Sequence, residues 1–262
     1  MVNRRQVLAS GIGLSTLNVV GTANAVTEKA AIRELGLENE YIEVLQEQGV
    51  EKATEILEKN NVECVHNKSK ITGRDLVGSD FSTEGRYTKT ESEIDVIIGR
   101  LSRGDNLWYA AGNVIFIGAK STVRDVTQIA DAIGITWPDS DWTGERPDSD
   151  GVNYWSTYDN SEHDIAPPTH DISHEDYDTG TGVAGSVDIT YSMPQHTIVG
   201  MGVPIERIRP GANAVQFNYK HNYAFSYITG SASISICAGA LCVTLPWGAS
   251  TAWDIERAIL ID

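Results

Sequence analysis

The stretch GANAVQFNYKHNYAFSYITGSASISICAGALCVTLPWGASTAW, residues 211–253, decides the fold class of this chain. Lys220 is its only charged residue, although 21% of the residues in the whole chain are charged. Within it, Ser233-Ile234-Ser235-Ile236 alternates strictly between polar and apolar side chains. Such alternation indicates a strand with one buried face. We therefore predict strands at 214–219, 223–229, 231–237 and 241–245, and a final strand or short helix at 253–261.

The low charge of residues 211–253 has two explanations, which the sequence leaves open. Burial inside the protein is the commoner cause of an uncharged segment. A surface that meets a partner or a membrane is the other.

The preceding sequence also favours strands. Residues 94–101, 107–111 and 114–117 are apolar runs, and Gly112-Asn113 between the last two is typical of a turn. Ser121 or Thr122 then begins a predicted helix that ends at Gly134. The apolar side of that helix would carry Val123, Val126, Ile129, Ala130 and Ile133. Another strand is predicted at 186–191.

The first part of the mature chain has a helical pattern. Apolar residues recur at helical spacing in three short segments of 26–65, namely 27–36, 39–49 and 50–60. Residues 66–93 are polar and rich in Gly, Ser, Thr and Lys, so we expect a linker or loops there. The predicted fold class is therefore α+β: short N-terminal helices, then a mainly antiparallel, sandwich-like β domain over 94–262.

The centre of that β domain is strongly acidic. Residues 131–178 hold 13 acidic side chains and one basic side chain, Arg146, with aromatic residues between them. Four prolines interrupt the segment. We expect a long acidic loop region with exposed aromatic residues.

The N-terminus has the pattern of a secretory signal peptide. Arg4 and Arg5 precede a mild apolar run, and Ala23-Asn24-Ala25 places small residues where a signal peptidase cuts. Paired arginines are typical of the twin-arginine export route. We therefore expect residues 1–25 to be removed and the mature protein to be extracellular, without a transmembrane anchor.

The charge of the chain limits its partners. It contains 36 Asp and Glu against 20 Lys and Arg, a formal net charge of −16. A nucleic-acid partner is excluded, because phosphates require a basic face. Together with the export signal, this acidity resembles exported haloarchaeal proteins. The resemblance implies a halophilic protein whose dense carboxylates hold water and cations in high salt. It names no functional family.

The three cysteines suggest one disulfide. Cys237 and Cys242 bracket Ala238-Gly239-Ala240-Leu241, and a tight hairpin there would bring their Cβ atoms within bonding reach. Export would favour the bond over two buried thiols. Cys64 is left over, and His66 lies two residues from it as a conceivable catalytic base. Asn67-Lys68-Ser69 is a sequon that predicts glycosylation of Asn67.

Two acidic segments have metal-ligand patterns. His163, His170 and His174 lie among carboxylates, and the H-x3-H spacing places two imidazoles on one face of a helix, as in zinc sites. The segment 139–150 resembles a calcium loop. Its candidate ligands are Asp139, Asp141, Thr143, Glu145 and Asp150. A solvated acidic surface explains both segments without a cofactor, so calcium and zinc are alternatives rather than firm assignments.

Three functions are consistent with these patterns. We favour a secreted, non-enzymatic binding or interaction protein whose partner is a protein, a cell surface or a carbohydrate. Carbohydrate is included because Trp137, Trp142 and Trp155 accompany paired acids. The first alternative is a metal-dependent secreted hydrolase that uses His163, His170 and His174. The second is an exported antimicrobial or toxin-like precursor, in which a C-terminal amphipathic hairpin is shielded by the acidic part of the chain.

Overall fold

A computed structural model describes residues 29–71, 92–117, 130–145, 151–159, 172–187, 196–211, 213–224, 231–246 and 249–261. The predicted leader, with Arg4, Arg5, Ala23 and Ala25, lies outside these residues. The same is true of His163, His170 and Asp150.

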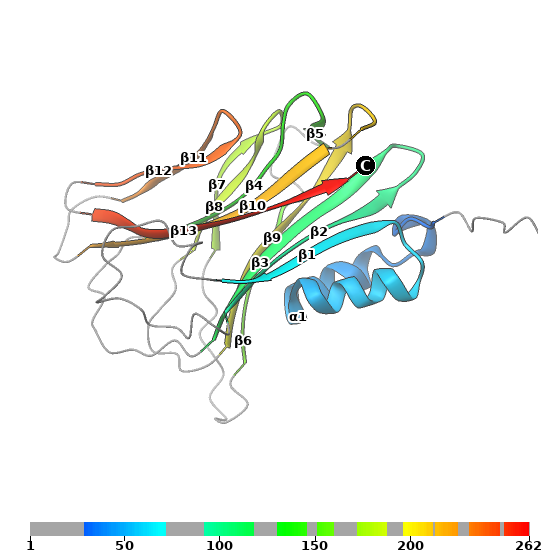
Figure 1. Ribbon diagram of the computed structural model, residues 1–262, viewed down its shortest axis with the longest axis horizontal. Coiled ribbons are helices and arrows are strands. Elements are labelled where there is room, and N and C mark those ends of the chain that lie inside the picture. The colour runs from blue at the N-terminus through cyan, green and yellow to red at the C-terminus, as the bar shows by residue number, and fades with distance from the viewer. Residues whose placement is uncertain are drawn as a thin grey trace, which may run out of the picture.

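The described strands form two antiparallel sheets and a separate two-stranded hairpin (Figure 1). The first sheet has the order β1-β2-β3-β9-β5, and β6 also pairs with β9. Its strands are β1 (Cys64–Lys70), β2 (Glu93–Ser102), β3 (Leu107–Ile117), β5 (Trp142–Gly144), β6 (Asn153–Asp159) and β9 (His196–Arg207). The second sheet has the order β13-β10-β4-β8-β7. Its strands are β4 (Asp131–Thr136), β7 (Ile172–Asp178), β8 (Gly182–Val187), β10 (Asn213–Ala224) and β13 (Ala249–Ile261).

The main core lies between the two sheets, so the mainly antiparallel, sandwich-like architecture is present. Trp108 and Ile205 of the first sheet and Phe217 and Ile133 of the second are each fully buried in this core. Gly112 lets the Phe217 ring of the second sheet pack directly against the backbone of the first sheet. A Cβ atom at this position would lie 2.5 Å from Phe217 Cδ2, so the aromatic ring occupies the space that a side chain would need.

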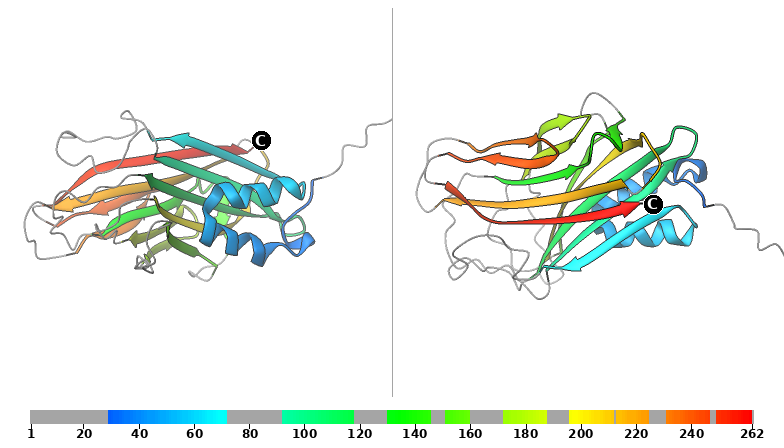
Figure 2. Two further views of the ribbon diagram at one scale, coloured as in Figure 1. Left: turned by 90° about the horizontal axis from the view of Figure 1, so that it is seen from below. Right: turned by 45° about the horizontal axis from the view of Figure 1, so that its top comes forward.

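One helix, α1 (Glu38–Lys59), covers the outer face of the first sheet (Figure 2). A 3-10 turn, η1 (Arg33–Leu35), precedes it. Gly49 interrupts α1 with φ 82°, where two separate helices were predicted to meet. Tyr41, Leu45 and Leu57 are fully buried against the sheet and form a second core. No helix within the described ranges is both long and apolar enough to cross a membrane.

The hairpin of β11 (Ser233–Cys237) and β12 (Ala240–Thr244) lies on the outer face of the second sheet, remote from α1 (Figure 1). Its two-residue turn has φ 47° at Ala238 and 79° at Gly239. Positive φ at both central residues is the hairpin-turn geometry that matches the twist of paired strands. The molecule therefore has a layered order of helix, sheet, sheet and hairpin.

Several local predictions are wrong. Gly112-Asn113 lies inside β3 and makes no turn, because both residues face packed partners there. Ile133 and Gly134 belong to β4 and not to the end of a helix. Residues 66–70 pair with β2 as part of β1 instead of forming a linker. By contrast, the strand predicted as one of two options for residues 253–261 is confirmed.

The expected acidic loop region, 131–178, is also wrong for its described residues. It contributes β4, β5, β6 and β7. The polar sequence of β7 fits a strand because β7 is the edge of its sheet, and Ser173, His174 and Glu175 are exposed. Exposed positions at a sheet edge accept charged side chains.

Candidate functional site

The predicted zinc segment is only partly described. His174 lies on strand β7, so the helical geometry expected for the H-x3-H pair is wrong at this residue. Its Nδ1 atom lies 2.7 Å from the Tyr154 hydroxyl oxygen. Burial raises the pKa of Tyr154, which keeps this hydroxyl protonated. Among the residues that the structure describes, no group of three or more His, Cys, Asp or Glu side chains could hold a metal ion.

The predicted calcium loop is not assembled among its described residues. Asp141 Oδ1 accepts hydrogen bonds from Arg209 Nη2 at 2.7 Å and from the Ser140 hydroxyl at 2.8 Å. The Thr143 hydroxyl donates to the Thr179 carbonyl, and Glu145 Oε1 lies 3.6 Å from Arg33 Nη1. These side chains are directed to protein partners because β5 begins at Trp142 and straightens the segment. Asp141, Thr143 and Glu145 thus contact protein partners, and Asp139 is exposed. The described residues do not form a metal-binding group here, and the calcium loop stays a prediction.

The contacts of Asp141 predict a pH dependence. The Ser140 hydroxyl and the Arg209 guanidinium lower the pKa of Asp141. A carboxyl group with a lowered pKa contributes stability above its ordinary value of about 3.9, and this contribution is lost as the pH falls. We expect Asp141→Asn to lower the Tm at pH 7, and the difference from the wild type to narrow below about pH 4. Thermal unfolding of both proteins between pH 7 and pH 3 measures this, and a difference that does not change with pH would contradict it.

The tryptophans of the predicted carbohydrate site are not available to a sugar. Trp137, Trp142 and Trp155 are 2%, 0% and 4% exposed. Trp142 packs edge-to-face on Trp108 in the main core, and Trp155 belongs to the core beneath α1. Their aromatic faces are covered by protein, so the basis for a carbohydrate partner at these residues is wrong.

His66, but not Cys64, lies beside a buried carboxylate on the neighbouring strand. His66 Nε2 lies 3.3 Å from Asp95 Oδ1, and the Asp95 side chain is fully buried. Burial raises the pKa of the Cys64 thiol, which is the opposite of what a nucleophilic cysteine needs. Asn67, the predicted glycosylation site, also lies on β1, and its Nδ2 donates to the Ala258 carbonyl at 3.1 Å.

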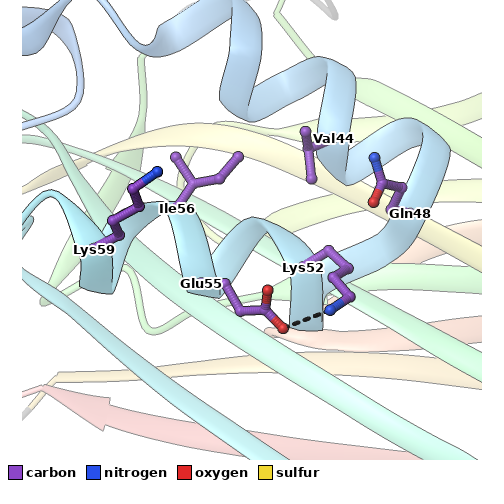
Figure 3. A pocket seen from close by; sticks show the side chains of 6 residues that line it. All are labelled: Val44, Gln48, Lys52, Glu55, Ile56 and Lys59. Carbon is purple, nitrogen blue, oxygen red and sulfur yellow. Dashed lines mark hydrogen bonds and ion pairs between the residues drawn. The ribbon is translucent and has the colours of Figure 1, made fainter.

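A shallow groove of about 250 Å³ lies between the two halves of α1 (Figure 3). Val44 and Ile56 are its apolar lining residues, and Lys52 Nζ, which also lines it, lies 2.7 Å from Glu55 Oε1. The other side chains that line it are Gln48 and Lys59. An open groove of this size is smaller than the usual range for small-molecule sites, about 300–1,000 Å³.

The hairpin β11–β12 has the most distinctive chemistry of the described surface. The sulfur atoms of Cys237 and Cys242 are at disulfide distance, as predicted, and their Cα atoms are 5.9 Å apart. In the strand register, Ile234 pairs with Val243 and Ile236 with Leu241. These four apolar side chains share one face, since paired residues lie on the same side of a sheet. The opposite face carries the disulfide and the small polar side chains Ser233, Ser235 and Thr244.

The apolar face of the hairpin rests on a small area of the second sheet. Ile234 and Leu241 are buried against Ala132 and Ala184, while Ile236 and Val243 are only partly buried. Full burial of such a side chain contributes about 1.5–3 kcal/mol, so this contact is weak beside the main core. A hydrogen bond also holds the hairpin to the second sheet: the Ile236 N–H donates to Asp176 Oδ2 of β7 at 2.7 Å.

The hairpin is an insertion between two strands that are already paired. Strands β10 and β13 pair along their lengths as far as Ala224 and Ala249, which are register partners. Residues 225–248 therefore connect the ends of adjacent antiparallel strands, and two residues are enough for such a connection. The sandwich does not need the hairpin for its own connectivity.

Sequence reasoning found the alternation and the cysteine pairing of this hairpin, because both signals are local. It missed the contacts with Ala132, Ala184 and Asp176, which come from distant parts of the chain. No sequence pattern marked these residues.

Comparison with known proteins identifies no family. No protein-family model matches this chain, and no curated protein matches it. A solved structure described as "Pore forming protein" aligns with 76% of this chain and 90% of its own chain, at 5% sequence identity and a TM-score of 0.29. A TM-score this low does not establish a shared fold.

Proposed function

We propose that this protein is an exported, non-enzymatic interaction protein, and that the hairpin β11–β12 is the element with which it contacts its target. The insertion of the hairpin between the paired strands β10 and β13 carries this proposal. A segment that the sandwich does not need for connectivity, yet that is closed by a disulfide, is suited to a role outside the fold.

The charge distribution supports the same role. The chain has no Asp, Glu, Lys or Arg between Lys220 and Asp254, although its net charge is −16. Burial in the sandwich accounts for the low charge of β10. It does not account for the hairpin, where Ser233, Cys237 and Thr244 are exposed. An exposed, uncharged element on an acidic protein is a contact surface that a partner can approach without desolvating charges.

Export is supported by the paired arginines and the A-x-A pattern at the N-terminus. The disulfide pair is consistent with an oxidising compartment. The acidity is consistent with a halophilic protein that keeps a charged surface in high salt.

The test replaces residues 225–248 by Asn-Gly, which joins β10 to β13 through a two-residue turn. Labelled wild-type and variant proteins are sedimented with intact haloarchaeal cells in molar salt. We expect the variant to keep its cooperative thermal unfolding and to lose binding at least tenfold. Lys59→Ala, in the groove of α1, is the control and should bind like the wild type. Unchanged binding by a folded variant would overturn the assignment of the hairpin, and retention of the wild-type protein inside the producing cell would overturn export.

A further inference from the structure

We propose that the target of the hairpin is a lipid membrane, and that the hairpin leaves the second sheet to lie flat in the membrane interface with its apolar face toward the acyl chains. This inference rests on the proposed function and specifies its partner. It starts from the two faces of the hairpin, since an amphipathic element must cover its apolar side in any stable state.

Among the residues that the structure describes, the apolar face of the hairpin is covered only by the second sheet. Ile234 and Leu241 are buried against the small side chains Ala132 and Ala184, and Ile236 and Val243 remain partly exposed. A lipid interface offers a second cover that would bury all four side chains. If the hairpin moves from the second sheet to the lipid interface, the sandwich core stays intact, because the core between the sheets contains no hairpin residue.

The lack of charge favours lipid over a protein partner. Protein interfaces tolerate charge at their polar rims, whereas charged side chains are costly in the hydrocarbon region, so an element with no charge at all suits lipid. The described hairpin has no charged side chain on either face or at its turn. Its polar face consists of serine and threonine hydroxyls and a disulfide, which can lie against headgroups and water.

Strand length and backbone chemistry determine the orientation. Five residues at about 3.4 Å per residue extend about 17 Å, roughly half of the 30 Å hydrocarbon core. The described hairpin is therefore too short to span a bilayer. Both outer edges of this two-stranded sheet lack a paired strand among the described residues. Unpaired edges are not tolerated in hydrocarbon but can bond to water in the interface, so the hairpin lies flat.

Two features of the rest of the protein control the movement of the hairpin from the second sheet to the membrane. The Ile236 N–H bond to Asp176 must break when the hairpin leaves the sheet. The net charge of −16 repels anionic lipid headgroups. At about 1 M salt the screening length falls to about 3 Å, so this repulsion is largely removed. Binding to neutral vesicles should therefore depend little on salt, while binding to anionic vesicles should require high salt.

The experiment measures co-flotation of the full chain with phosphatidylcholine vesicles, and with vesicles containing 30% phosphatidylglycerol, at low and molar salt. Val243→Asp places a charge on the apolar face, and Thr244→Asp places the same charge one residue away on the polar face. We expect Val243→Asp to reduce flotation at least tenfold and Thr244→Asp to change it less than twofold. Equal loss in the two variants would overturn the proposal, as would a wild-type protein that floats with neither vesicle.

A second pair of variants tests release from the sheet. Asp176→Ala removes the acceptor of the Ile236 N–H and should increase flotation with phosphatidylcholine about threefold. Asp105→Ala makes the same charge change in the exposed turn between β2 and β3 and should have no effect. If Asp176→Ala floats with phosphatidylcholine vesicles no more than the wild type does, the proposed release of the hairpin from the sheet is overturned.

The outcomes separate this inference from the proposed function. Hairpin-dependent binding to cells without binding to protein-free vesicles would overturn the lipid target and retain the hairpin as the contact element. Binding that does not depend on the hairpin in either assay would overturn both. Thermal unfolding shows whether each variant is folded, and the Asn-Gly replacement of residues 225–248 gives the value expected for a protein with no hairpin.

Discussion

Replacing Gly112 by alanine is expected to lower the free energy of unfolding by about 3 kcal/mol. The added methyl group would lie 2.5 Å from Phe217 Cδ2 and 2.7 Å from Phe217 Cβ, well inside van der Waals contact. Gly112 lies on β3 of the first sheet and Phe217 on β10 of the second. Phe217 is fully buried and is held among the side chains of both sheets, so its ring has little room to move away. Either the ring leaves its position or the sheets separate locally, and both responses reduce packing.

Urea unfolding followed by tryptophan fluorescence measures this effect. Gly104→Ala is the matched control, because a Cβ atom there meets nothing within 4 Å and the residue is exposed. The control should change the free energy of unfolding by less than about 0.5 kcal/mol. A loss below about 1 kcal/mol for Gly112→Ala would show that the ring is not confined as the packing implies. The test also reports whether the two sheets unfold together, since Gly112 and Phe217 join them.

The dipeptide Gly112-Asn113 explains why part of the fold was not predictable. Glycine followed or preceded by asparagine is a strong local signal for a turn. In this protein the two residues are needed for other reasons: Gly112 makes room for Phe217, and Asn113 binds helix α1. Both partners are far away in the sequence. Local composition cannot distinguish a glycine needed for a turn from a glycine needed for close packing.

The hairpin was predictable for the opposite reason. Its alternation over 233–236 and the short separation of its two cysteines are properties of one continuous segment. The strands of the acidic region were missed because polar residues dominate β7, whose exposed edge position only the assembled sheet reveals. Similarly, the placement of the hairpin on Ala132 and Ala184 follows from the pairing of β4 with β8. The chemistry of the candidate site was therefore visible in the sequence, but its position and its weak attachment were not.

Position and chemistry together distinguish the hairpin from the rest of the uncharged segment. Strands β10 and β13 belong to the sandwich, and their apolar residues Val215, Phe217 and Ile259 are buried between the sheets. In β10 burial explains why Lys220 is the single charged residue, whereas β13 carries Asp254, Glu256 and Arg257. The hairpin is free of charge, but it contributes only two buried residues, Ile234 and Leu241. One charge-free stretch thus contains both a structural part and the proposed contact element.

Replacing Asn113 by alanine is expected to lower the free energy of unfolding by about 2 kcal/mol. Gly49 breaks α1, so the Val50 N–H begins the second half of the helix without the usual carbonyl acceptor one turn earlier. Asn113 Oδ1 accepts this N–H at 2.7 Å in a fully buried position, and a strand thus supplies the N-terminal cap of a helix. Alanine would leave a buried N–H without an acceptor, which costs about 1–3 kcal/mol.

The control for Asn113→Ala is Asn60→Ala at the other end of the same half-helix. The Asn60 side chain also bonds to the helix, donating to the Ile56 carbonyl at 2.9 Å, but it is exposed and water can replace it. We expect this control to cost less than about 0.5 kcal/mol. Amide hydrogen exchange gives the specific readout: Asn113→Ala should speed exchange in residues 50–59 more than in the strands of the second sheet. Uniform acceleration across the protein would contradict the capping role, because it would mean that Asn113 stabilises the sandwich as a whole and not the attachment of α1 to it.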